Sequence, residues 1–167
     1  QAHLRSLEGT AFFVGKAGLF LTARHVLANC LARSSDSHLE IGMVVKGDDG
    51  KSAEERLVPI ERFEFAPDPY DVAAGQAAYF PASPLRLAIT DVGLWQKVAA
   101  LGYPTSAAVT EDEALWMNPR GLKGYVQRCT LPRDMPIGAH PDGLELSFLI
   151  GPGMSGAPVF TIPDEIV

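Results

Sequence analysis

Short runs of alternating apolar and polar residues cover most of the chain, which is the pattern of half-buried β-strands. The runs at residues 10–14 and 19–22 flank the turn residues from Gly15 to Gly18, so they predict a hairpin. Residues 23–31 lose the alternation and predict one or two helical turns. Further strands are predicted at residues 39–46, 56–65, 71–77, 97–101, 107–110, 124–130, 144–148 and 156–160.

A proline-containing segment divides these strands into two groups. Residues 80–93 hold Pro81, Pro84 and Gly93, so they predict a linker between an N-terminal half, residues 1–79, and a C-terminal half, residues 94–167. A chain of 167 residues with 47% hydrophobic and 20% charged residues has the size and composition of one globular domain. Sixteen Gly and thirteen Pro residues favour many turns over a helical bundle. The sequence therefore predicts an all-β protein built from two small antiparallel barrels or sheets.

The charge balance is acidic, with a formal net charge of −6 from 14 basic and 20 acidic residues. An acidic chain without a cluster of Lys or Arg repels a phosphate backbone, so we expect no nucleic acid partner. No apolar run approaches the roughly 18 residues of a membrane-spanning helix, so we expect no membrane partner either.

The two cysteines, Cys30 and Cys129, lie far apart in the sequence and outside any CxxC or Cys/His metal spacing. We expect both to be buried thiols that act as small apolar side chains, although one long-range disulfide is also compatible with the sequence. This cysteine usage and the lack of a basic-then-apolar leader leave the cellular location unknown but favour the cytoplasm.

Three short segments carry side chains that can do chemistry. His25 follows a predicted strand in Thr-Ala-Arg-His-Val, Asp71 opens a strand in Tyr-Asp-Val-Ala, and Ser155 lies among the glycines of residues 151–158. Alone, each has an ordinary explanation as a helix, turn or loop residue. Together they supply a nucleophile, a base that accepts its proton and a carboxylate that orients the base. The surrounding glycines allow backbone N–H groups to point at one oxyanion.

The order and surroundings of these residues resemble those of the chymotrypsin-like (trypsin-like) serine peptidases, and especially the single-domain bacterial members of HtrA type. Residues 9–14 resemble the opening G-x-x-F-x-V strand of that family, and residues 22–25 resemble its TA-x-H motif. The G-x-S-G-x-P motif is matched by Gly153, Ser155, Gly156 and Pro158. The resemblance spans nearly the whole chain, because residues 102–104 (Gly-Tyr-Pro) also look like the turn after the first strand of the second barrel of the family.

The resemblance implies two packed six-stranded antiparallel barrels. It also implies a serine endopeptidase that hydrolyses a polypeptide substrate through an acyl-enzyme, with no metal or cofactor. By the same resemblance, His25 is the general base and then the acid, Asp71 orients it, and Ser155 is the nucleophile. The N–H groups of Gly153 and Ser155 would form the oxyanion hole. Asp68 is a rival for the orienting acid, but it lies between two prolines and precedes no apolar strand.

Two departures from the family pattern change what we expect. Met154 precedes the nucleophile where the secreted digestive members carry an Asp, so activation by cleavage of the N-terminus is not expected here. Only twelve residues follow Ser155, whereas the family needs about two more strands to complete the second barrel. We therefore expect the second barrel to be incomplete at its C-terminal end in this chain. Either the missing strands lie outside this sequence, or a regulatory domain or a partner chain completes the barrel.

The base of the specificity pocket in the family lies about six residues before the nucleophile, which points to Leu149 and Ile150. These side chains favour a small or medium apolar residue at the cleaved position, unless both are simply core residues. A function of another class also stays open, namely a catalytically silent, protease-like domain that binds peptides or a partner chain by strand addition.

Overall fold

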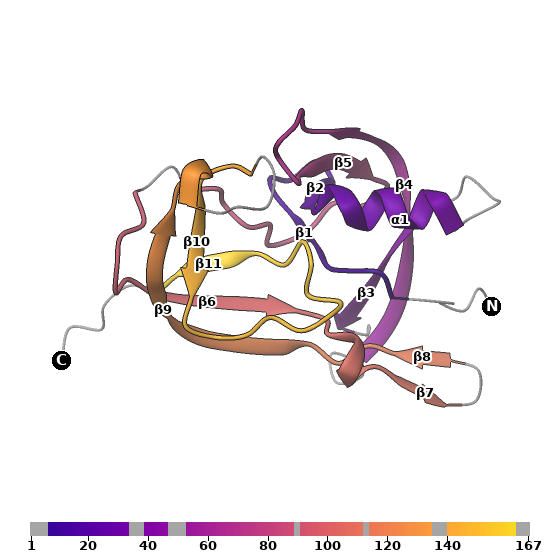
Figure 1. The fold of residues 1–167 in the computed structure, drawn as a ribbon. Coiled ribbons are helices and arrows are strands. Elements are labelled where there is room, and N and C mark those ends of the chain that lie inside the picture. The colour runs from indigo at the N-terminus through magenta and orange to yellow at the C-terminus, as the bar shows by residue number, and fades with distance from the viewer. Residues whose placement is uncertain are drawn as a thin grey trace.

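The computed structural model describes residues 7–33, 39–46, 53–88, 91–111, 114–134 and 140–162 of the chain. Within these ranges the strands form two larger antiparallel sheets that lie side by side, and one α-helix, α1 (Arg24–Arg33), lies at the end of the first sheet (Figure 1). The all-β fold class predicted from the alternation is confirmed.

The first sheet has five strands in the order β1-β2-β5-β4-β3. They are β1 (Ala11–Phe13), β2 (Leu19–Thr22), β3 (Glu40–Lys46), β4 (Ala53–Phe65) and β5 (Ala73–Ala77). The long strand β4 belongs to two ladders, because residues 53–59 pair with β3 while residues 60–65 pair with β5. The register shifts between Ile60 and Arg62, which is the kind of irregularity that bends a strand. The sheet therefore curls toward a barrel.

The two outer strands of this curled sheet, β1 and β3, face one hollow of about 370 Å³. Phe13 of β1, residues 43–45 of β3 and residues of the segment 79–85 line the hollow. This segment meets β1 through an isolated bridge between Val14 and Leu85. Its prolines cannot donate to a strand ladder. Residues 79–85 therefore cover the gap that a sixth strand would fill, and the barrel is nearly closed.

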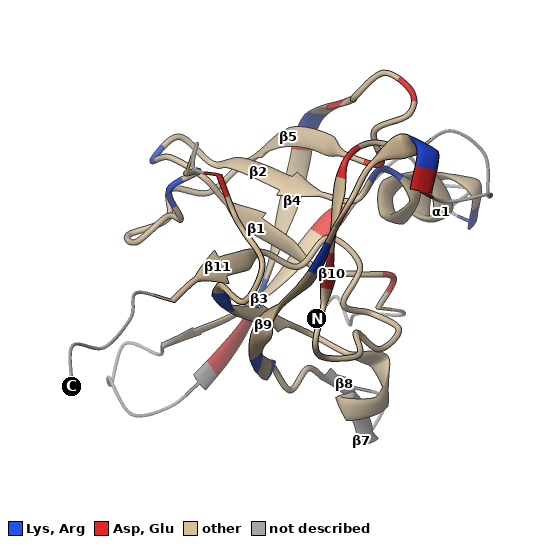
Figure 2. Cartoon of the chain, turned by 60° about the vertical axis from the view of Figure 1, so that its left-hand side comes forward, with Lys and Arg blue, Asp and Glu red and all other residues tan. Residues whose placement is uncertain are grey.

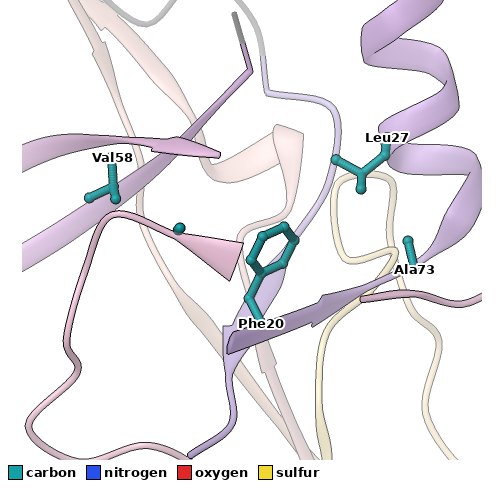
Figure 3. Close-up of a cluster of buried hydrophobic side chains, with 5 residues drawn as sticks. Phe20, Leu27, Val58 and Ala73 are labelled. Atoms are coloured by element: carbon teal, nitrogen blue, oxygen red, sulfur yellow. The ribbon is translucent and has the colours of Figure 1, made fainter. Parts of the chain in front are cut away.

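The core of the first sheet is centred on Phe20, whose ring lies between Val58 of β4 and Leu27 of α1 (Figure 3). The alternation on β2 decides which side chains reach this core: Phe20 is 0% exposed, whereas its neighbour Leu19 is 45% exposed. Small residues on β5, among them Ala73, pack beneath the ring. The packing of α1 on this core fixes the start of the helix relative to the sheet.

The second sheet has four strands in the order β10-β9-β6-β11. They are β6 (Lys97–Gly102), β9 (Arg120–Thr130), β10 (Gly143–Leu146) and β11 (Val159–Thr161). A separate hairpin pairs β7 (Val109–Glu111) with β8 (Ala114–Trp116), and two 3₁₀ turns, η1 (Thr105–Ala107) and η2 (Pro132–Asp134), lie in the connections. Only β8 was missed by the pattern. β11 begins three residues later than predicted because residues 156–158 belong to the connection before the strand.

The predicted linker, residues 80–93, contains no strand among its described residues apart from the bridge at Leu85. The division into halves at residues 79 and 94 remains a prediction. Basic residues lie on separate elements of both sheets, interspersed with acidic ones (Figure 2). Among the described residues, no helix is long and apolar enough to span a membrane.

The expectation that both cysteines are buried is wrong for Cys129. Cys129 lies on β9 with its side chain exposed, because the inward positions of that part of the strand are taken by Val126 and Thr130. Cys30 of α1 is partly buried, and both thiols are free. Burial, and secondarily the charge of Glu8, raises the pKa of Cys30 above its ordinary value.

The position of Phe20 predicts a large stability difference between neighbouring residues. Phe20→Ala should lower the free energy of unfolding by about 3–5 kcal/mol, because the cavity forms in the centre of the first core. Leu19→Ala on the same strand is the matched control and should cost less than about 1 kcal/mol. Urea denaturation of both variants measures the difference, and equal losses would contradict this assignment of the core.

The two thiols should differ in reactivity. The raised pKa of Cys30 lowers its thiolate fraction at neutral pH, so its alkylation should be slow and should accelerate as the pH rises. Cys129 should react first because it is exposed. Peptide mass spectrometry after timed iodoacetamide treatment at pH 7.5 and pH 9 measures both rates. Faster labelling of Cys30 at neutral pH is the outcome that contradicts this prediction.

Candidate active site

His25 and Asp71 form the central pair of the site. β2 ends at Thr22 and α1 begins at Arg24, so His25 is the second residue of the helix, while Asp71 lies in the turn before β5. The Nδ1 atom of His25 is 2.6 Å from Oδ2 of Asp71, and both side chains are about half exposed. Because an ionised carboxylate can only accept hydrogen bonds, this contact assigns the imidazole proton to Nδ1. Nε2 is then free to accept a proton.

Asp71 also stabilises the start of the helix. Its Oδ1 accepts a hydrogen bond from the His25 N–H at 2.9 Å, and its backbone carbonyl accepts one from the Arg24 N–H at 3.3 Å. The first N–H groups of a helix have no partner inside the helix and attract negative charge. Since α1 has no acidic residue in its own first turn, a carboxylate from another turn serves it. One side chain thus fixes both the ring and the backbone of His25.

The rival carboxylate, Asp68, has a different partner. Asp68 forms an ion pair with Arg24, and the guanidinium of Arg24 also lies over the Phe65 ring, 5.6 Å from its centroid. These contacts tie the turn that contains Asp68 and Asp71 to the first residue of α1. The structure therefore joins Asp71 to the imidazole and leaves Asp68 outside the pair.

Ser155 lies in the loop between β10 and β11, and this loop crosses from the second sheet to the side of β1 (Figure 1). The Ser155 carbonyl accepts a hydrogen bond from the Thr10 N–H at 2.8 Å. Gly9 packs closely here, since a β-carbon on it would lie 2.9 Å from the Ser155 carbonyl oxygen and 2.5 Å from a methyl group of Val26. Ser155 thus lies beside the first turn of α1. Within the described part of the chain, its hydroxyl makes no hydrogen bond, to His25 or to any other residue.

Two backbone N–H groups of this loop, those of Gly153 and Ser155, have no acceptor among the described residues. Their directions follow from the carbonyl of the same peptide, because the C=O and N–H of a trans peptide point in opposite directions. The Pro152 carbonyl accepts hydrogen bonds from the N–H of Thr105 at 2.9 Å and from its hydroxyl at 3.3 Å. The Met154 carbonyl accepts a hydrogen bond from the Ala157 N–H at 2.9 Å. Both peptides are held by their carbonyls, which leaves two N–H donors available to an anion.

Gly153 meets two local requirements that only glycine satisfies. Its φ is +89°, a conformation that L side chains rarely adopt. A β-carbon there would also lie 2.6 Å from the Tyr103 carbonyl oxygen and 2.6 Å from the Thr105 nitrogen. The close contact with residues 103–105 holds the loop against the end of β6.

Burial raises the pKa of Tyr103, so this phenol stays protonated at neutral pH.

The residues around the nucleophile candidate divide into buried and exposed ones. Met154 is 2% exposed and packs toward Gly102 of β6, so it fills the core where a charged residue would have needed a partner. Leu149 is 94% exposed and Ile150 is 49% exposed. The alternative that these two side chains are core residues is therefore wrong, because residues 147–150 lie in the connection after β10 rather than on a covered strand.

The other serines and histidines do not join the site. Ser147 is structural, because its Oγ accepts a hydrogen bond from the Tyr125 N–H at 2.9 Å and its own N–H returns one to the Tyr125 carbonyl. Ser106 is exposed in η1. The Nδ1 atom of His140 forms a hydrogen bond with the Pro141 carbonyl oxygen at 2.8 Å. In the described ranges, no three His, Cys, Asp or Glu side chains gather as metal ligands would.

Sequence reasoning missed three residues that support this site, namely Thr10, Arg24 and Thr105. None of them is a nucleophile, base or orienting acid of the motifs described above, so sequence reasoning assigned them no role. One signal was available for Thr10, because a polar residue at an inward position of a strand needs a buried hydrogen-bond partner.

Comparisons with known proteins identify the family of the chain and structures of similar fold. A family model described as a trypsin-like peptidase domain matches residues 9–167. No curated protein sequence matches the chain. Among solved structures, Deg5 is similar with a TM-score of 0.63 and 19% identity, over 92% of this chain and 68% of that one.

Two further solved structures are similar in the same way. The MamO protease domain from Magnetospirillum magneticum has a TM-score of 0.59 and 18% identity, over 93% of this chain and 79% of that one. A serine-to-alanine mutant of Rv3671c from M. tuberculosis, in an inactive form, has a TM-score of 0.58 and 20% identity, over 93% of this chain and 64% of that one. Likeness at this level of identity shows a shared fold.

The bond between His25 and Asp71 predicts how a substitution changes the imidazole tautomer. In Asp71→Asn, the amide oxygen should keep the helix N–H, so the NH₂ group faces Nδ1 and the ring proton moves to Nε2. Side-chain ¹⁵N NMR of histidine-labelled protein above neutral pH reports the tautomer directly. Asp68→Asn is the matched control and should leave the proton on Nδ1. The same tautomer in wild type and Asp71→Asn would contradict the assigned bond.

Proposed function

Because the chain belongs to the family of trypsin-like peptidase domains and has the chymotrypsin-like fold, we propose that it is a serine endopeptidase. The observation that carries the proposal is the 2.6 Å contact between His25 Nδ1 and Asp71, next to a loop that offers Ser155 and two free N–H groups. An imidazole held with Nε2 free is the base that a serine hydroxyl needs.

In the proposed reaction, Oγ of Ser155 attacks the carbonyl carbon of the substrate while its proton moves to Nε2 of His25. Asp71 stabilises the imidazolium that forms and does not take up the proton itself. When the C–N bond breaks, the proton on Nε2 goes to the leaving amine. The acyl group then remains on Ser155 as an ester. A water molecule then gives a proton to Nε2 while its oxygen bonds to the acyl carbon. The bond between this carbon and Oγ breaks, the proton on Nε2 returns to Oγ of Ser155, and the carboxylic acid product leaves.

The free N–H groups of Gly153 and Ser155 are the proposed oxyanion hole. The negative charge that develops on the substrate oxygen needs donors that are already in place, because reorienting them during the reaction would cost free energy. Both peptides are held through their carbonyls, as described above, so their N–H groups are preorganised. Donors of this kind act only when the tetrahedral oxyanion forms, which is why they raise kcat.

The exposed apolar side chains before the loop suggest a preference in the substrate. Leu149 and Ile150 precede the nucleophile by six and five residues and reach solvent. Neither carries a charge that would pair with Lys or Arg. We therefore propose that the residue on the acyl side of the cleaved bond is apolar and of small or medium size.

One observation favours a second candidate function. The hydroxyl of Ser155 makes no hydrogen bond in the described part of the chain, so the step from nucleophile to base is not assembled there. A protease-like domain that binds peptides without cutting them would also tolerate this arrangement, with an extended peptide adding to a free strand edge. Catalytic hydrogen bonds often close only when substrate binds, and an intact set of three residues has no use in a binding module, so the peptidase remains the first proposal.

Covalent labelling separates the two functions. A fluorophosphonate probe should label wild-type protein on Ser155, and Ser155→Ala should lose labelling and lower peptide hydrolysis by at least about 10³-fold while its circular dichroism spectrum stays unchanged. Ser106→Ala is the matched control and should behave as wild type, since Ser106 lies exposed in η1. Folded wild-type protein that is not labelled, together with peptide binding that survives in Ser155→Ala, would support the binding module instead.

A further inference from the structure

We propose that Thr10 is a positioning residue that holds the proposed oxyanion hole in register with His25, an inference that rests on the proposed peptidase function. Thr10 directly precedes β1 and is 3% exposed. Its N–H, its carbonyl and its hydroxyl all have partners among the described residues. Those partners belong to the loop of Ser155, to the end of β2 and to the turn after β6.

The hydroxyl of Thr10 acts on the glycine of the loop. It donates a hydrogen bond to the Gly153 carbonyl at 2.9 Å, and its oxygen accepts one from the Tyr103 N–H at 3.0 Å. Gly153 is therefore held through both of its peptides, by Thr10 on one side and by the contact of Pro152 with Thr105 on the other. A residue held on both sides cannot rotate its N–H away without breaking one of these bonds.

The backbone of Thr10 links this loop to the base. Its N–H donates to the Ser155 carbonyl at 2.8 Å, and its carbonyl accepts from the Thr22 hydroxyl at 2.7 Å. Thr22 is the last residue of β2 and lies three positions before His25. One buried residue therefore connects the proposed nucleophile, the proposed oxyanion donor and the strand that leads to the imidazole. Buried hydrogen bonds of this kind are stronger than exposed ones because the surrounding dielectric is low.

Threonine is the side chain that this position needs. Valine has nearly the same shape, so Thr10→Val would fill the same space. It would leave the buried Gly153 carbonyl and the partly buried Tyr103 N–H without partners. The loop would then turn to satisfy these groups, and the Gly153 N–H would turn with it. Serine keeps the hydroxyl, so Thr10→Ser should keep both hydrogen bonds.

Kinetics of three variants test the proposal. Thr10→Val should lower kcat about 10- to 100-fold with KM within about twofold of wild type, since the donors act only in the transition state. Its affinity for a peptide boronic acid should fall by a similar factor. Thr10→Ser should stay within about threefold of wild type. Thr130→Val replaces a buried threonine on β9 that, within the described ranges, makes no hydrogen bond to the loop of Ser155. This variant should keep wild-type kcat at temperatures where all variants are folded.

Backbone NMR supplies a readout that does not depend on activity. In Thr10→Val the amide resonances of Gly153 and Ser155 should shift and their hydrogen exchange should accelerate, while Thr130→Val should leave them unchanged. If wild type hydrolyses nothing but these resonances respond as described, the peptidase function fails and the positioning role stands. If a folded Thr10→Val variant has unchanged resonances, or if Thr10→Ser is as slow as Thr10→Val, the positioning role of Thr10 is refuted.

Discussion

The hydrogen bond from the Thr10 N–H to the Ser155 carbonyl, 2.8 Å long, joins the two sheets at the place where the chemistry is proposed. The residues on either side of this bond belong to different folding elements: one leads into β1 and β2, and the other precedes β11. A site assembled from two sheets depends on contacts of this kind, because a displacement of about 1 Å between its halves is enough to impair catalysis. Glycines such as Gly9 allow the backbones to approach this closely.

The candidate site combines rigid supports with exposed side chains. Phe20 and Leu27 anchor the start of α1 to the core, while His25 and Asp71 remain about half exposed to solvent. The carboxylate of Asp71 serves the helix N-terminus as well as the imidazole, so the ring is oriented by the same interaction that begins the helix. A substitution of Asp71 should therefore affect both the orientation of the His25 ring and the start of α1.

Much of this arrangement could be predicted from the sequence, because it depends on local patterns. Alternation located most of the strands, and the motifs around His25 and Ser155 pointed to the loops that the structure brings together. The choice of Asp71 over Asp68 rested on the apolar strand that follows Asp71, and the structure pairs Asp71 with the ring.

The features that could not be predicted are those that depend on tertiary contacts. The exposure of Cys129 is set by which side of β9 faces the core, and that of Leu149 by its place in the connection after β10; composition alone gives neither. The inward position of Thr10 signals that it needs a buried hydrogen-bond partner, but no local signal identifies Gly153 as that partner. Residues 79–85 take the place of a sixth strand in the first barrel. They contain prolines, so the sequence shows no strand pattern there.

The length of β4 has a consequence for robustness. This strand runs without interruption from its ladder with β3 to its ladder with β5 and ends at Phe65, over whose ring the guanidinium of Arg24 lies. The turn that carries Asp71 continues directly from that end. The pairing of β4 with β3 is therefore connected through one continuous backbone to the turn that carries Asp71. We expect substitutions along β4 to disturb the position of this carboxylate more than their distance from it suggests.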